Sequence, residues 1–326
     1  MRSLKHVSAR TVDEACSLLK RYKGRARLNA GGTDLLPMLK GEILFDYPEV
    51  LINIKTISGL DHIREDGDTL RIGALAKLSD IAISPLLGQR YRVLVEAAYS
   101  VATPQVRNMA TLGGNLCQDV RCSYYRYPRH IGGPIRCLRK GDGPCLAVSG
   151  DNRYHAILGG KRCFAVCPSD TAVALAALDA RIKIASSRGE RSISVTDFFG
   201  GLGNSLKGDE MVTEIEVPRG TDLANQTFLK FTLRDPVDFA IVSVASVIVV
   251  EGGICSDVRI ALGAIAPSPV RVRKAEEVIK GRSIDKKVAT EAADQAVAGA
   301  KPLSMNAYKV EITRRLVERA ILSQDS

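Results

Sequence analysis

The chain has 326 residues, enough for two or three domains, and its 45% hydrophobic and 25% charged residues are typical of a globular protein. It has no apolar run long enough to span a bilayer, and charged residues interrupt the N-terminus where a secretory signal would be apolar, so we expect a cytoplasmic protein. The net charge of +10 is not accompanied by any nucleic-acid-binding motif, so we expect neither a nucleic-acid nor a membrane partner.

The first predicted element is an amphipathic helix that begins after Thr11 and stops at Gly24. Thr11 and Glu14 have the spacing of a capping box, and apolar residues recur at helical spacing behind them. The pattern then predicts, in chain order, a strand at 26–30, a short helix or turn at 35–39, strands at 51–54 and 70–73, and helices at 78–87 and 93–101.

Residues 118–153 lack periodicity, which predicts an irregular segment that needs another organiser. Beyond it we expect a helix at 170–178, strands at 182–185, 193–195, 211–217, 228–233, 240–250 and 258–263, and helices at 272–280, 286–300 and 307–321. Strands followed by helices predict an α+β C-terminal domain that begins near residue 222.

Two glycine pairs, Gly31-Gly32 and Gly113-Gly114, lie in loops beside predicted elements. Glycine lets a backbone approach a ligand closely, and the exposed N–H groups of such loops can bind a diphosphate. Tight turns without a ligand are the alternative for either loop alone. Neither the dinucleotide-binding G-x-G-x-x-G nor the P-loop motif occurs, and Gly201-Leu202-Gly203 lacks the third glycine.

Four segments in order carry a family resemblance: AGGTD at 30–34, TLGGNL at 111–116, YHAILGG at 154–160 and PSD at 168–170. Together they resemble the FAD-binding subunit of the xanthine dehydrogenase and carbon monoxide dehydrogenase family. The resemblance implies an α+β protein with a two-lobed FAD-binding domain of the PCMH or vanillyl-alcohol-oxidase type at 1–221. A small C-terminal domain of the CO dehydrogenase flavoprotein type, an antiparallel sheet with three helices, would follow at 222–326.

The same resemblance implies the residues that bind FAD. The two glycine loops would wrap the diphosphate, Asp170 would bind the ribityl or flavin region, and Val212 and Lys230 would lie against the isoalloxazine. A lysine there suits the negative charge that reduction places on the flavin, although an outward-facing strand lysine is the alternative. The cofactor-binding set is therefore Ala30, Gly31, Gly32, Thr33, Asp34, Thr111, Gly113, Gly114, Asn115, Asp170, Val212 and Lys230.

Six of the eight cysteines lie between Cys117 and Cys167. In a reducing compartment such clustering favours metal or redox chemistry over disulfides. Four thiolates suit an iron–sulfur cluster or zinc, and a loop with few apolar residues can gain its order from the metal. Cys117 and Cys167 could form zinc-type pairs with Cys122 and Cys163, so they remain alternative ligands.

The stretch from Leu112 to Cys122 and the inserted cysteines are similar to the 4-hydroxybenzoyl-CoA reductase branch of the family, whose inserted loop binds a [4Fe–4S] cluster. This likeness implies that Cys122, Cys137, Cys145 and Cys163 bind such a cluster, although the last spacing is longer here. It also implies an electron-transfer subunit without molybdenum or a catalytic residue of its own. Its partners would be a molybdopterin-binding large subunit and a [2Fe–2S] small subunit, in a dimer of heterotrimers.

The implied reaction is reductive dehydroxylation of 4-hydroxybenzoyl-CoA, with ferredoxin as electron donor. The basic residues of the cysteine-rich stretch would then form the ferredoxin entry point: Arg121, Arg126, Arg129, Arg136, Arg139 and Lys140. Two alternatives stay open. One is the FAD subunit of a xanthine, aldehyde or CO dehydrogenase-type hydroxylase with another substrate, and the other is a zinc-stapled binding protein without redox function.

Overall fold

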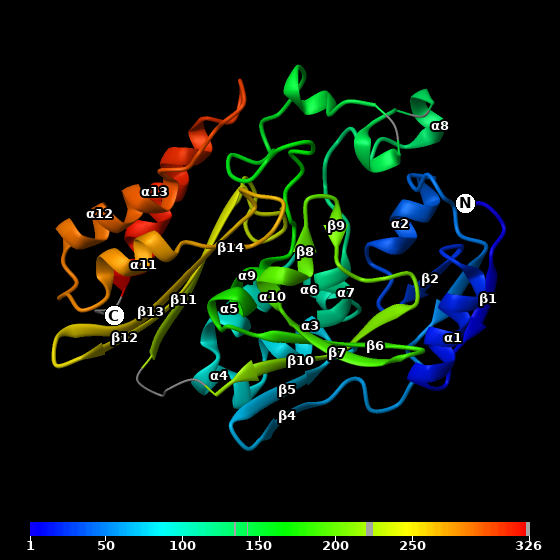
Figure 1. The fold of residues 1–326 in the computed structure, drawn as a ribbon, viewed down its shortest axis with the longest axis horizontal. Coiled ribbons are helices and arrows are strands. Elements are labelled where there is room, and N and C mark those ends of the chain that lie inside the picture. Colours follow the sequence, from blue (N-terminus) through cyan, green and yellow to red (C-terminus); the bar gives the residue numbers. More distant parts are fainter. Residues whose placement is uncertain (134, 142, 220–223, 324–326) are drawn as a thin grey trace.

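The computed structural model describes residues 1–133, 135–141, 143–219 and 224–323 (Figure 1). The domain boundary expected at 221/222 lies outside these described residues. No helix in the described part of the chain combines the length and apolarity needed to cross a membrane.

The first lobe is a parallel three-stranded sheet covered by the N-terminal helix. The strand order is β1-β3-β2, and the elements are β1 (Lys5–Ser8), α1 (Val12–Tyr22), β2 (Ala26–Asn29), α2 (Leu35–Lys40) and β3 (Val50–Asn53). Thr11 caps α1 by accepting a hydrogen bond from Glu14 N, and the helix ends where Lys23 and Gly24 take left-handed backbone angles. The sequence predicted α1, β2 and α2 but not the short edge strand β1.

The second lobe is an antiparallel five-stranded sheet in the order β4-β5-β10-β6-β7. Its strands are β4 (Ile63–Asp66), β5 (Thr69–Gly73), β6 (Arg181–Ser186), β7 (Gly189–Ser194) and β10 (Glu210–Pro218). Its helices are α3 (Leu78–Ala82), α4 (Pro85–Arg90), α5 (Arg92–Tyr99), α6 (Pro104–Arg107), α7 (Leu112–Cys117), α9 (Asp170–Ala177) and α10 (Val195–Phe198), and β8 (Phe199–Gly200) and β9 (Gly203–Asn204) form a small hairpin.

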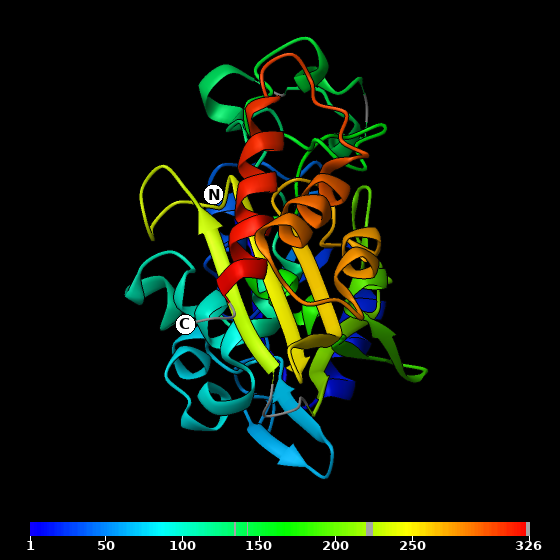
Figure 2. The same cartoon turned by 90° about the vertical axis from the view of Figure 1, so that its left-hand side faces the viewer.

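The C-terminal sheet has the order β11-β12-β13-β14 and is buried on both faces. Val244 and Ile248 of β12 pack on the C-terminal helices, whereas Ala245 and Val247 face the core of the second lobe, as the two-residue period of a strand requires. Figure 2 shows the three helices on the outer face. The elements are β11 (Ala224–Phe231), β12 (Val242–Glu251), β13 (Ile254–Gly263), β14 (Val270–Arg271), α11 (Arg273–Ile279), α12 (Lys286–Val297) and α13 (Tyr308–Leu322). The predicted α+β architecture is confirmed.

The cysteine-rich segment, residues 118–153, stands at one end of the molecule near α2 and the start of α13 (Figure 1). Among its described residues only short turns of helix form: α8 (Arg129–Gly132), η1 (Leu138–Lys140) and η2 (Leu146–Val148). The predicted irregularity of this segment is confirmed.

Candidate functional site

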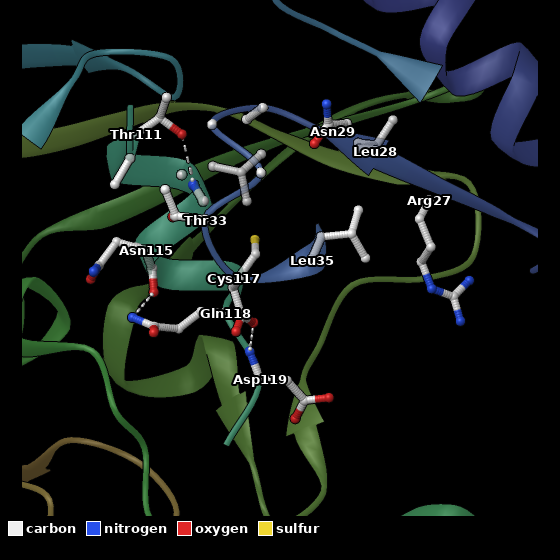
Figure 3. A pocket seen from close by; sticks show the side chains of 18 of the residues that line it. Arg27, Leu28, Asn29, Thr33, Leu35, Thr111, Asn115, Cys117, Gln118 and Asp119 are labelled. Atoms are coloured by element: carbon white, nitrogen blue, oxygen red, sulfur yellow. Dashed lines mark hydrogen bonds between the residues drawn. The ribbon is translucent and has the colours of Figure 1, made fainter. Parts of the chain in front are cut away.

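A cavity of about 760 Å³ lies where the two lobes and the C-terminal sheet meet. Both glycine loops line it, together with Asp170 at the start of α9, Val212 on β10 and Lys230 on β11. All twelve residues predicted to bind the cofactor therefore line one cavity. Figure 3 shows Thr33, Thr111 and Asn115 along one wall, with Leu28 and Leu35 on another.

Each glycine loop approaches a neighbouring segment more closely than a side chain would permit. A Cβ atom on Gly31 would lie 2.0 Å from the carbonyl oxygen of Met109, and one on Gly113 would lie 2.8 Å from the Ala74 side chain. Glycine is thus required at both positions by close backbone contact.

The second glycine loop is fixed by polar contacts. Thr111 caps α7 by accepting a hydrogen bond from Gly114 N at 3.2 Å (Figure 3). Asn115 Oδ1 accepts hydrogen bonds from Ser169 Oγ at 2.6 Å and Thr171 Oγ1 at 2.7 Å. The loop that holds Asp170 is thereby attached to the glycine loop, although the two are far apart in sequence.

Asp170 and Lys230 form a buried ion pair at the inner end of the cavity. Their side chains are 6% and 5% exposed, and Lys230 Nζ lies 2.8 Å from Asp170 Oδ2. Burial raises the pKa of Asp170, while the Lys230 ammonium opposes that rise. Lys230 also donates a hydrogen bond to the Ser100 carbonyl at 2.8 Å. The alternative of an outward-facing strand lysine is wrong.

Asp34 connects the first glycine loop to the cysteine-rich segment. Its Oδ1 atom lies 2.8 Å from Arg121 Nη2 and 2.7 Å from Arg126 Nη2, and its Oδ2 atom accepts a hydrogen bond from Asp119 N at 2.9 Å. The carboxylate is therefore engaged by donors of the protein itself, which join the first glycine loop to the cysteine-rich segment.

Asn29 and Phe239 also line the cavity, and the sequence did not single out either of them. Asn29, the last residue of β2, has a buried Oδ1 atom with no hydrogen-bond partner among the described residues. Arg121 stacks on the Phe239 ring, with 4.5 Å between its guanidinium carbon and the ring centroid. Asn29 could have been found from its place directly before the glycine loop, whereas the stacking joins residues more than one hundred positions apart.

The four cysteines predicted as cluster ligands line one narrow cavity of about 20 Å³. Cys137 and Cys163 are buried, and Cys122 and Cys145 are half-buried. Cys117 and Cys167 do not line this space, although both lie against the neighbouring cavities. The structure thus groups the four predicted ligands and leaves the two alternatives out.

The spacing of these side chains does not match a site for one metal ion. Four sulfurs around one tetrahedral zinc lie about 3.8 Å apart. No group of three or more His, Cys, Asp or Glu side chains in the described residues could hold a single ion. A cubane cluster separates its ligands further, because each cysteine binds a different iron. Four cysteines around one small cavity are a donor set of the kind that binds an iron–sulfur cluster.

Positive charge and N–H donors surround the sulfurs. His155 Nε2 lies 3.3 Å from Cys122 Sγ, and Arg139 Nε donates to Cys163 Sγ at 3.3 Å. Burial raises the pKa of the Cys122 thiol, and the backbone amides of Tyr125 and Tyr124 partly offset this. These amides oppose the effect of burial without cancelling it, so the pKa of Cys122 stays above its usual value.

The expected basic surface on this segment needs a correction. Arg126 is held inward by Asp34 and by the carbonyls of Asp119 and Val120, and Arg139 and Lys140 are likewise directed into the protein. Burying a charged group without a partner costs free energy, so these buried side chains contact polar groups within the chain. Arg129 and Arg136 are exposed.

Comparison with known proteins identifies the domains. Residues 2–220 match the family model "FAD binding domain in molybdopterin dehydrogenase", and residues 227–324 match "CO dehydrogenase flavoprotein C-terminal domain". The chain is 33% identical to the FAD-binding subunit of aldehyde oxidoreductase from Escherichia coli, covering 97% of this chain and 96% of that protein. It is 31% identical to the carbon monoxide dehydrogenase medium chain of Hydrogenophaga pseudoflava, covering 96% and 93%.

Solved structures agree. Carbon monoxide dehydrogenase from H. pseudoflava, in a form that lacks the Mo-pyranopterin moiety of the molybdenum cofactor, superposes with a TM-score of 0.79 at 27% identity, covering 99% of this chain and 98% of that one. Quinoline 2-oxidoreductase from Pseudomonas putida 86 gives a TM-score of 0.78 at 25% identity, covering 99% and 97%. The chain therefore belongs to the FAD-binding subunits of the molybdenum hydroxylases, a family of oxidoreductases.

Proposed function

We propose that this chain is a FAD- and [4Fe–4S]-containing electron-transfer subunit of a molybdenum enzyme that reductively dehydroxylates 4-hydroxybenzoyl-CoA. The four-cysteine cavity, which the FAD-binding motifs do not account for, carries the proposal. Its inserted segment resembles the corresponding segment of 4-hydroxybenzoyl-CoA reductases. Cys122, Cys137, Cys145 and Cys163 would hold the cluster, and the twelve residues of the larger cavity would hold FAD.

The chain's own residues suit these tasks. The N–H groups of the two glycine loops would bind the diphosphate, and Val212 would pack against the isoalloxazine. Lys230 would lie at its N1–C2 edge, held there by Asp170. When bound, FAD and the cluster would supply electron transfer in two-electron and one-electron steps. The protein would fix their positions and exclude water from them.

A second cavity of about 370 Å³ supports a relay between the two sites. Cys122 lines it, and it shares Arg121, Asp170 and Phe239 with the cavity proposed for FAD. The cysteine site thus adjoins the flavin end of the larger cavity. Arg121, which is adjacent to Cys122 in sequence and paired with Asp34, belongs to both sites.

The names of the relatives support the proposed assembly. They are called medium chains, medium subunits or FAD-binding subunits, so each works as part of a complex. We propose a molybdopterin-binding large subunit and a [2Fe–2S] small subunit as partners, a dimer of such heterotrimers, ferredoxin as donor and a cytoplasmic location. We also propose 1–221 and 222–326 as its two domains, with an iron–sulfur insert at about 118–153 closed by Cys163.

The first experiment is chemical analysis of the full-length chain after anaerobic purification. We expect one FAD and about four irons and four sulfides per chain, with an EPR signal after dithionite reduction. Cys137→Ser should abolish that signal. Cys117→Ser and Cys167→Ser are matched controls that should retain it, because neither residue lines the four-cysteine cavity. Flavin without iron would leave an ordinary FAD subunit, and zinc without flavin would overturn both assignments.

The alternative substrate needs a separate test. Relatives of this chain serve aldehyde, nicotinate and nicotine oxidation, as their names state, so a hydroxylase of another substrate is the second candidate. The purified complex should reduce 4-hydroxybenzoyl-CoA with reduced ferredoxin. Turnover of an aldehyde or a nitrogen heterocycle in its place would favour the second candidate.

A further inference from the structure

Two of the four cysteines have a side-chain nitrogen within hydrogen-bond distance of the sulfur. Arg139 Nε donates to Cys163 Sγ, and His155 Nε2 lies within hydrogen-bond distance of Cys122 Sγ, both at 3.3 Å. Among the described residues, no side chain donates to Cys137 or Cys145. The two donors come from different parts of the chain, Arg139 from η1 and His155 from the loop beyond the cysteine-rich segment.

Arg139 is held firmly by its other contacts. Its side chain is only 5% exposed, and its Nη atoms donate to the Leu202 carbonyl at 2.9 Å and the Gly201 carbonyl at 3.3 Å. Asp119 is its one carboxylate partner among the described residues, at 3.5 Å. A planar guanidinium with this many fixed donors cannot turn its Nε–H away from Cys163.

His155 is positioned by the C-terminal domain. Its carbonyl accepts hydrogen bonds from Lys309 Nζ and from Asn306 Nδ2, each at 3.1 Å. Its Nδ1 atom is buried and has no partner among the described residues. A buried ring nitrogen without a hydrogen-bond donor costs less free energy than a buried N–H group without an acceptor. The ring proton is therefore assigned to Nε2, which faces the sulfur.

We propose that Arg139 and His155 are positioning residues of the four-cysteine site that raise the reduction potential of its cluster. This inference rests on the proposed [4Fe–4S] cluster. Reduction adds one negative charge to the cluster, and N–H donors to its sulfurs stabilise that added charge. Removing either donor should therefore favour the oxidised cluster, without removing any ligand.

The test is an EPR-monitored redox titration of the full-length chain, with iron content measured on every sample. Arg139→Gln and His155→Phe should each shift the one-electron equilibrium about tenfold towards the oxidised cluster, a lowering of about 59 mV. Arg162→Gln is the matched control, because Arg162 is exposed and adjacent to Cys163, and has no side-chain hydrogen bond among the described residues. It removes the same charge and should shift the equilibrium less than threefold.

Conservative variants keep the test decisive if a variant loses iron. Arg139→Lys and His155→Gln retain a donor and should stay within threefold of the wild-type equilibrium. Unchanged potentials in Arg139→Gln and His155→Phe, at four irons per chain, overturn this inference and leave the proposed function intact. A wild-type chain without iron overturns both. Equal shifts in Arg162→Gln and Arg139→Gln would assign the effect to charge alone, against the hydrogen bond.

Discussion

Asp170 and Lys230 hold opposite charges where water can scarcely screen them. Both side chains are at least nine-tenths buried, and the ammonium also contacts the Ser100 carbonyl. Removing one partner of such a pair is strongly destabilising, because the other charge is left without compensation. The pair thus ties α9 of the second lobe to β11 of the C-terminal sheet, on the wall of the cofactor cavity.

Lys230→Met should lower the free energy of unfolding by about 3–5 kcal/mol and reduce the FAD content of the purified chain. The double variant Lys230→Met/Asp170→Leu removes both charges and should recover much of the lost stability. Chemical denaturation gives the free energies, and released flavin gives the FAD content. A loss below about 1 kcal/mol in the single variant would mean that the pair is solvated like a surface salt bridge.

Lys309 is a second buried cation, and it has no carboxylate partner among the described residues. Its Nζ atom donates to the carbonyls of His155 and Ala264, and burial lowers its pKa to about 7. Between about pH 7 and pH 10 the folded chain therefore binds fewer protons at this site than the unfolded chain. The contribution of Lys309 to the free energy of unfolding therefore increases as the pH rises through this range.

Comparison of the wild type with Lys309→Met should show this dependence. The difference in unfolding free energy, wild type minus variant, should grow by up to about 1.4 kcal/mol per pH unit between pH 7 and pH 9. Below pH 6 it should be flat, because both states are then protonated. Denaturation curves at each pH measure it, and a constant difference from pH 6 to pH 9 would contradict the lowered pKa.

At the scale of elements, the glycine loops join structures that are distant in sequence. Gly31 lies two residues beyond strand β2 and meets the loop after α6, and Gly113 lies in α7 against Ala74 beyond β5. The cofactor cavity therefore depends on three backbone segments in mutual contact. A single methyl group between them would displace one segment.

Gly31→Ala should destabilise the chain by about 1–3 kcal/mol and lower its FAD content, because the added Cβ would meet the Met109 carbonyl oxygen at 2.0 Å. Gly88→Ala is the matched control. Gly88 lies in α4, where a Cβ would meet nothing within 4 Å, and alanine there favours the helix by about 0.5–1 kcal/mol. Titration of the apo chain with FAD would report the affinity, and equal affinities in the two variants would refute the steric argument.

Several elements could be predicted because their signals are local. The cap at Thr11 and the stop at Gly24 bound α1 correctly, since both depend on neighbouring residues. The helix predicted at 78–87 is instead two helices, α3 and α4, because Ser84 and Pro85 start a new helix there. Strand β1 was missed because its pairing with β3 joins residues 45 positions apart, which local pattern does not record.

At the scale of the whole molecule, the cysteine-rich segment and the loop that follows it bear basic side chains of two kinds. Arg126 and Arg139 are used within the fold, whereas Arg129 and Arg162 are exposed. Only the exposed set can attract an acidic protein such as the proposed ferredoxin, since association rates depend on charge at the surface.

Charge reversal at Arg129 and Arg162 should slow ferredoxin-dependent reduction of the complex by about tenfold at low salt and should reduce its salt dependence. Lys286→Glu/Lys287→Glu is the matched control, because both lysines are exposed at the start of α12 in the C-terminal domain. Stopped-flow reduction at several salt concentrations measures the rates. The same slowing in both double variants would indicate a general effect of net charge, with no docking at the cysteine-rich segment.

The sequence predicted which residues line the two cavities better than it predicted the contacts that fix those residues in place. The family resemblance predicted both the twelve residues that line the larger cavity and the four cysteines that line the small one. The bonds from Asp34 to Arg126 and from His155 to Cys122 were not foreseen, because each depends on how distant segments fold together. The inward orientation of Arg126 was missed for the same reason: sequence shows a charge but not its burial.

The contacts between residues 304–309 and the loop around His155 have a consequence for the order of folding and cofactor insertion. Asn152 binds Ser304 and the Met305 amide, and His155 is held by Asn306 and Lys309. Translation delivers all four cysteines well before these residues leave the ribosome. On the ribosome the nascent thiols therefore lack the contacts that enclose them in the finished protein. Insertion of the proposed cluster would therefore have to precede the docking of residues 304–309 on this loop, while a maturation factor can still reach the sulfurs.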